Sequence, residues 1–130
     1  MATAGVRTLL AADTTVDADA NQTAVRAAAA GWLTPAYAAQ VRQFAPVAAP
    51  GAVWNRWTAH RVYVRVTARL GGDDHPPGTA VTAYRQVTAV LRPVGRDGWH
   101  GAAVPVTVFV TVTHRPGGWL LAGLQTSTTT

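Results

Sequence analysis

Apolar and polar side chains alternate along residues 61–70, as expected for a β-strand that is buried on one side only. The apolar set is Val62, Val64, Val66, Ala68 and Leu70. The polar set is Arg61, Tyr63, Arg65, Thr67 and Arg69. The segment therefore predicts a strand with a dry face and a solvated face, and the solvated face carries a row of guanidinium groups.

The same period of two predicts three more strands, at about 79–92, 103–115 and 119–125. Breaker-rich segments separate them: 71–78, 93–101 around Asp97-Gly98, and 115–118. Strands joined by short turns predict an antiparallel meander.

The first half of the chain has helical spacing instead. It predicts helices over 19–32, 35–45 and 50–57, the second with Thr34 as N-cap and Pro35 at its first position. Residues 1–18 have weak periodicity and predict a flexible lead-in, and residues 126–130 predict a frayed tail. One α+β domain over 19–125 follows, because helices and strands are segregated along the chain.

We expect the valine-rich side of the sheet to be buried against the helices. The predicted core comprises Val62, Val64, Val66, Val106, Val108 and Val110, together with Trp32, Phe44 and Trp54.

All eleven basic residues are Arg and all six acidic residues are Asp, which gives a net charge of +5 and is typical of a GC-rich bacterial gene. A basic chain of this kind suits an acidic protein, nucleic acid or anionic lipid. The chain has no Cys, which excludes disulfides and thiolate metal sites. No apolar run approaches about 20 residues, and residues 1–12 do not match a signal peptide.

No catalytic constellation is visible. The acids Asp13, Asp17, Asp19, Asp73, Asp74 and Asp97 fall in the lead-in, at a helix start, in a loop or in a turn. None of them lies on the inward face of a predicted strand, so a carboxylate general base is missing and the sequence predicts that the protein is not an enzyme. His60, His75, His100 and His114 are too scattered for a metal site, and no cofactor is predicted.

A pocket protein is the alternative hypothesis. By parity Arg85 falls among small apolar residues on the dry face, where a guanidinium needs a partner. It is either a pocket cation for an anionic ligand, or it is turned outward by a bulge or paired with helix-terminal carbonyls. His114 and Trp54 are the other candidate pocket residues.

The solvated side of the sheet is the predicted protein-interaction surface. Its candidate residues are Tyr63, Arg65, Arg69, Tyr84 and Phe109. Aromatic residues and Arg are enriched at protein interfaces, and a row of like charges favours an acidic partner. The partner would be another copy of the chain or another component of an assembly. Base stacking on the same aromatics is the weaker nucleic-acid hypothesis, and an ordinary solvated face is the plain one.

Three segments carry a family resemblance. They are Ala-Ala-Gly-Trp-Leu at 29–33, Ala-Pro-Val-Ala-Ala-Pro-Gly-Ala at 45–52 and Gly-Gly-Trp-Leu-Leu-Ala-Gly-Leu at 117–124. With the order of the predicted elements, they resemble the NTF2-like superfamily, and within it the extracytoplasmic domains of conjugative transposon TcpC-type proteins.

The resemblance implies an NTF2-like cone, with three N-terminal helices packed on a curved, mainly antiparallel sheet of four long strands. It also implies a non-enzymatic scaffold in an actinobacterial conjugation, or type IV secretion-like, assembly. Such domains follow a membrane anchor, so the resemblance places the chain at the extracytoplasmic face of a bacterial membrane if an anchor precedes it. The same superfamily supplies the alternative, a ketosteroid-isomerase-like or SnoaL-like pocket protein.

Overall fold

The computed structural model describes residues 2–17, 20–44, 51–71 and 77–128. Within these ranges four helices come first: α1 (Ala2–Leu10), α2 (Ala20–Ala29), α3 (Pro35–Gln43) and α4 (Ala52–Ala59). Four strands follow: β1 (Tyr63–Leu70), β2 (Thr82–Val94), β3 (Val104–Arg115) and β4 (Gly118–Thr128). This order confirms the α+β class, with four helices in place of the predicted three.

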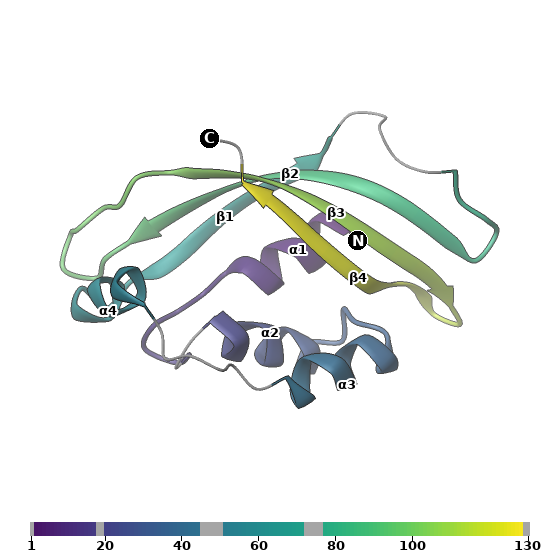
Figure 1. The fold of residues 1–130 in the computed structure, drawn as a ribbon, viewed down its shortest axis with the longest axis horizontal. Coiled ribbons are helices and arrows are strands. Elements are labelled where there is room, and N and C mark those ends of the chain that lie inside the picture. The colour runs from purple at the N-terminus through teal and green to yellow at the C-terminus, as the bar shows by residue number, and fades with distance from the viewer. Residues whose placement is uncertain (1, 18–19, 45–50, 72–76, 129–130) are drawn as a thin grey trace.

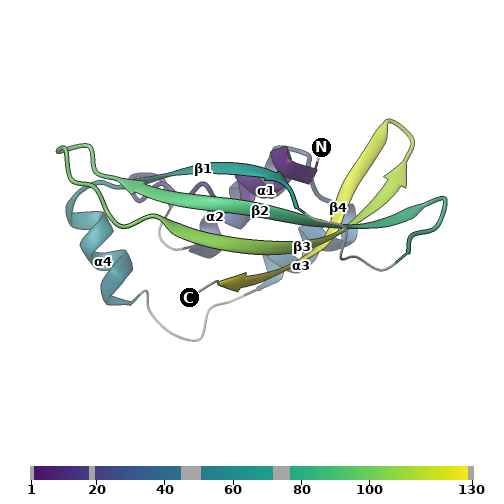
Figure 2. The ribbon, with the colours of Figure 1, turned by 90° about the horizontal axis from the view of Figure 1, so that it is seen from above.

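The strands form one antiparallel sheet in the order β1-β2-β3-β4, as the meander predicted. The sheet curves, and the helices lie below its concave side (Figure 1). Seen from above, α4 lies at one end of the sheet and β4 crosses it obliquely (Figure 2). The pairing of β3 with β4 shifts register between Thr111 and Val112, an irregularity that increases local twist.

The concave face is dry because side chains in each strand alternate. Ala89 of β2 lies between Ala68 and Val106, and its neighbour Val87 lies opposite Val108. Among the predicted core residues, Val62, Val64, Val106, Val108 and Val110 are buried. Val66 is only half-buried because β1 is the edge strand. Within the described part of the chain, the valine rows thus form the floor on which the helices pack.

Helix α1 corrects the expectation of a flexible lead-in. Its buried residues are Ala2, Gly5, Val6 and Leu9, which share one helical face. A Cβ atom at Gly5 would lie 2.6 Å from Leu121 Cδ1, so the absence of a side chain lets α1 approach β4 closely. The face was missed because most of its members are small, which weakens the hydrophobic contrast along the helix.

The other elements follow the predicted spacing, with shifted ends. Thr34 caps α3 through a 3.2 Å hydrogen bond from the Tyr37 amide to its hydroxyl. β1 begins at Tyr63, two residues after the predicted start, because Arg61 takes a left-handed conformation with φ of 52°. The predicted tail is wrong for residues 126–128, which extend β4 along β3. Residues 129–130 lie outside the described part.

The predicted aromatic core is also corrected. Trp32 and Trp54 are half-buried and Phe44, the C-cap of α3, is 61% exposed. The helical layer packs mainly through Ala, Val and Leu, as at Ala27 and Leu33. No helix in the described ranges is long and apolar enough to cross a lipid bilayer.

Candidate interaction surface

The convex side of the sheet, called here the outer face, points away from all four helices (Figure 1). Strand register determines which residues share it. Arg65 lies opposite Arg92, Arg69 lies opposite Thr88, and Gln86 lies opposite Phe109. Phe109 is 43% exposed and both β1 arginines are exposed. The outer face therefore combines apolar area with guanidinium groups, as the alternation predicted.

The five predicted interface residues lie on this face but do not form one compact patch. Tyr63 pairs with Val94 at one end of β2, whereas Tyr84 lies ten residues away along the same strand, or roughly 33 Å at the usual rise per residue. Arg65 and Arg69 lie between them on the edge strand. The structure thus places Tyr63 and Arg65 near one end of the face and Tyr84 and Phe109 towards the other, with Arg69 between them.

Tyr63 has an intramolecular role. The guanidinium carbon of Arg96 lies 5.0 Å from its ring centroid, a cation–π arrangement. Its backbone forms an isolated bridge with Asp13. Tyr63 therefore helps to fasten the end of the sheet, and the open part of the outer face begins at Arg65.

Every carboxylate in the described part of the chain has a basic partner. Asp17 pairs with Arg26, Asp13 pairs with Arg96, and Asp97 pairs with His60. Asp19, Asp73 and Asp74 lie outside the described residues. Among the described ones, no acid pairs with Arg65 or Arg69, so none of them offsets the positive charge at this edge of the outer face.

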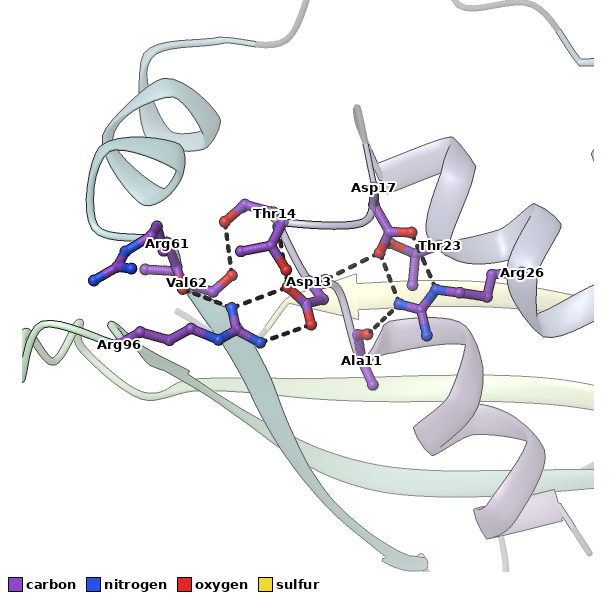
Figure 3. Close-up of polar contacts among 10 residues, drawn as sticks. Ala11, Asp13, Thr14, Asp17, Thr23, Arg26, Arg61, Val62 and Arg96 are labelled. Carbon is purple, nitrogen blue, oxygen red and sulfur yellow. Dashed lines mark hydrogen bonds and ion pairs between the residues drawn. The ribbon is translucent and has the colours of Figure 1, made fainter.

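Two of these ion pairs belong to a network at the α1–α2 connection (Figure 3). Asp17 is 4% exposed and accepts hydrogen bonds from the Asp13 amide, the Thr23 hydroxyl and both Nε and Nη2 of Arg26. Arg26 also donates to the Ala11 carbonyl oxygen. The network holds the α1–α2 connection against α2, so its role is structural.

The second half of the network extends to the sheet. Arg96, in the β2–β3 loop, donates to both carboxylate oxygens of Asp13 at 3.1 and 2.9 Å and to the Arg61 carbonyl oxygen at 2.8 Å. The Thr14 amide and hydroxyl both donate to the Val62 carbonyl oxygen. Segments far apart in sequence are thereby fixed at one end of β1.

The electrostatic consequence is a low pKa for both carboxyl groups. The hydrogen bonds from Arg96 lower the pKa of Asp13 to about 2, against a smaller opposing effect of burial. For Asp17, burial acts to raise the pKa, but the hydrogen bonds from Arg26, the Asp13 amide and Thr23 together outweigh it and the pKa is lowered. Neither group is poised for proton transfer near neutral pH.

A cavity of about 600 Å³ lies between α3 and the distal part of the sheet. Its lining includes Tyr37 and Gln40 of α3, with Arg85, Phe109 and Gln125 from the strands. Burial raises the pKa of Tyr37, which keeps its hydroxyl protonated at neutral pH. None of the described carboxylates contributes to the lining of this cavity.

Arg85 is exposed, and the β2–β3 register shows no bulge at its position. Its Nη1 donates to the Tyr84 carbonyl oxygen at 2.8 Å. The Gln86 carbonyl oxygen, two residues along and so on the same side of β2, accepts from Gly71. The Tyr84 carbonyl oxygen therefore also points toward the β1 side of β2, at a position beyond the last residue of β1. The Arg85 guanidinium forms its hydrogen bond at this unpaired stretch of β2. Arg85 is thus exposed rather than buried as predicted, and its partner is a strand carbonyl, neither a helix-terminal carbonyl nor the result of a bulge.

The other two candidate pocket residues lie elsewhere. Trp54 of α4 lines a separate, apolar cavity of about 300 Å³ together with Leu9 and Val64. His114 is exposed near the end of β3, with its ring 5.1 Å from that of Trp119 in an edge-on contact. The three candidates therefore do not converge on one site.

Sequence reasoning missed the roles of Asp13, Asp17, Arg26 and Arg96. Asp13 and Arg96 are separated by 83 positions, and no local spacing connects them. The one local indication was Arg26 itself. It lies among the apolar residues of α2, nine residues after Asp17, which is near enough in sequence to suggest that the two side chains pair. Within the described ranges, no group of three His or Asp side chains could hold a metal ion.

Comparison of the chain with protein-family models, with curated proteins and with solved structures finds no match.

Proposed function

We propose that this chain is a non-enzymatic protein-interaction domain that contacts an acidic partner through the outer face and its β1 edge. The observation that carries the proposal is the distribution of charge. Each described acid contacts a basic side chain, whereas Arg65 and Arg69 remain exposed on a face that the helices leave uncovered. Exposed Phe109 adds apolar area to the same face.

We further propose that the setting is an actinobacterial conjugation or type IV secretion-like assembly, at the extracytoplasmic face of the membrane. Support for this setting is the order of elements, helices first and a four-stranded antiparallel meander second, together with the resemblance of the segments at 29–33, 45–52 and 117–124. In such an assembly the domain acts as a scaffold, and its role requires no cofactor.

A small-ligand pocket is the second candidate function, favoured by the cavity of about 600 Å³ below the sheet. Tyr37 and Gln40 offer hydrogen bonds there, and Val110 and Leu124 offer apolar contact. This candidate would be supported by a small molecule whose binding shields Tyr37 from solvent and is lost in the Gln40→Ala variant. Isomerase or hydrolase chemistry is not part of this proposal, because the described residues of the lining include no carboxylate base.

The test of the main proposal is charge reversal on β1. Arg65→Glu/Arg69→Glu should leave the fold intact, because both side chains are exposed, and should weaken association and DNA transfer in a mating assay. Arg42→Glu/Arg56→Glu changes the net charge equally at exposed positions of α3 and α4 and serves as the matched control. Normal DNA transfer by the β1 variant, with an unchanged oligomeric state, would overturn the proposal.

A further inference from the structure

The outer edge of β1 is bonded at its start and open further along. The Thr14 amide donates to the Val62 carbonyl oxygen, and the Val64 amide donates to the Ala12 carbonyl oxygen at 2.7 Å. Even-numbered residues of β1 therefore point their backbone groups away from β2, since successive residues of a strand alternate. In the described part of the chain, nothing bonds the outward amide and carbonyl groups of Val66 and Ala68.

Basic side chains border this open stretch. Arg65 and Arg69 flank it on the outer face, and Arg92 lies directly opposite Arg65 on β2. A groove of about 490 Å³ runs between α1 and the edge and is lined by Arg7, Arg26 and Arg65 with Val66. Arg26 is already paired with Asp17, whereas Arg7 and Arg65 have no carboxylate partner among the described residues.

We propose that the β1 edge from Arg65 to Leu70 binds an extended acidic peptide segment of another protein as an added antiparallel strand. This inference rests on the proposed function and specifies its partner. The open backbone groups supply strand pairing, and the arginines select for acidic side chains. Because Arg65 and Arg69 are four residues apart on one face, the peptide carries carboxylates at positions i and i+4.

The register follows from which groups are open. Arg65 and Arg69 direct their own backbone groups to β2, so peptide residues opposite them form non-hydrogen-bonded pairs, in which side chains approach most closely. Peptide residues opposite Val66 and Ala68 exchange hydrogen bonds with the edge. The acidic residues thus contact guanidinium groups, while the intervening residues hold the strand in place.

Two other occupants fit less well. A second copy pairing edge to edge would bring Arg65 and Arg69 of both copies together, and the chain already carries a charge of +5. Nucleic acid would be attracted by the charge but has no alternating amide and carbonyl groups to match those of Val66 and Ala68. The arginines could also serve only to keep edges apart, a known use of charged residues on edge strands.

The experiment uses a fluorescent synthetic peptide of roughly ten residues that alternates Glu with Thr, enough to span the open edge. Binding to the full chain is measured by anisotropy, with Gln-Thr and Lys-Thr peptides as controls. Methylating the backbone nitrogens of the Thr residues should weaken binding at least about tenfold, because one lost hydrogen bond costs about that much. Methylating those of the Glu residues should leave binding unchanged, since these amides point away from β1.

Protein variants separate pairing from attraction. Ala68→Pro removes one outward amide without touching the β2 ladder and should weaken binding about tenfold or more. Arg65→Ala/Arg69→Ala should weaken it and reduce its salt dependence, whereas Arg42→Ala/Arg56→Ala should not. Circular dichroism and thermal unfolding check that each variant keeps the fold.

The outcomes are distinct. Equal binding of both methylated peptides, or unchanged binding by Ala68→Pro, overturns the edge-pairing inference. If Arg65→Glu/Arg69→Glu still impairs DNA transfer in that case, the proposed interaction function stands without it. Preference for the Lys-Thr or Gln-Thr peptide, or equal affinity for an oligonucleotide, overturns the acidic-peptide assignment. Dimerisation of the chain that Ala68→Pro abolishes would assign the edge to a second copy instead.

Discussion

Helices α1 and α4 differ in how far the size of their apolar side chains corresponds to their burial. α1 is built largely of small residues, yet Val6 is fully buried and Leu9 nearly so, because the helix lies against the concave face of the sheet. α4 carries two tryptophans, yet none of its residues is buried and Val53 is 57% exposed. Burial here depends on how closely a helix can approach the sheet, and small side chains such as Gly5 permit the closer approach.

The largest expected effect compares one valine from each helix. Val6→Asp places a carboxylate where the side chain is fully buried and has no partner, so it should cost at least about 3 kcal/mol of unfolding free energy. Val53→Asp introduces the same group at an exposed position and should change stability by about 0.5 kcal/mol or less. Urea denaturation measures both. Equal losses would mean that α4 packs as firmly as α1.

The connection after α1 should matter nearly as much. Asp17→Asn removes the negative charge from a buried site where Asp17 accepts hydrogen bonds from Arg26, Thr23 and the Asp13 amide. We expect a loss of about 2–3 kcal/mol, moderated because Arg26 is 46% exposed and can reach water. Asp97→Asn, at the exposed pair with His60 near α4, is the matched control and should shift the urea midpoint far less.

The sequence predicted features that depend on neighbouring residues better than features that depend on contacts between distant segments. The alternation in 61–70 correctly placed Val62 and Val64 in the core and Arg65 and Arg69 on the solvated side, because strand period is a local property. The start of β1 was missed, because a left-handed Arg61 depends on how α4 leads into the sheet.

The remaining errors have a common physical cause. Interactions between distant segments, such as Arg96 with Asp13, leave no local pattern. The same is true of α1, whose close packing on Leu121 belongs to the tertiary fold. On the candidate surface, parity placed Tyr84 and Phe109 on the outer face, but it could not show that Tyr63 is occupied by Arg96.

Acid should weaken the α1 end of the molecule, because Asp13 is bound to Arg96 as an ionised carboxylate. The pKa of Asp13 is about 2 in the fold and near 3.8 in the unfolded chain, so its stabilisation is present above pH 4 and is lost as pH falls through about 2. After allowance for solvent screening, the loss should be on the order of 1–2 kcal/mol. Urea titrations from pH 5 down to pH 2 measure most of it, since the loss begins near the unfolded pKa of 3.8 and levels off only below the folded pKa of about 2.

The Asp13→Asn variant is the control for this pH dependence. Its unfolding free energy should vary less over the same range, because the substituted side chain no longer titrates. Asp17 also has a lowered pKa and continues to contribute in both proteins. An identical pH dependence for the variant would show that the Arg96–Asp13 pair does not stabilise the fold.

The smallest expected effect tests whether α4 is coupled to the rest of the fold. Gly51 is the N-cap of α4 and makes no side-chain hydrogen bond, and an added Cβ atom would meet nothing within 4 Å. Gly51→Ser supplies a hydroxyl that can accept from the first turn of the helix, which is worth a few tenths of a kcal/mol. If α4 opens independently, hydrogen exchange of its amides should slow while the urea midpoint stays constant, because local opening does not require global unfolding.

Thr34→Gly at the N-cap of α3 provides the contrast: it removes the hydrogen bond from the Tyr37 amide at a buried site, and should lower the global midpoint. The opposite result for Gly51→Ser would be a higher urea midpoint whose gain in stability equals the slowing of hydrogen exchange in α4. That result would mean that α4 unfolds together with the rest of the core, as α1 does.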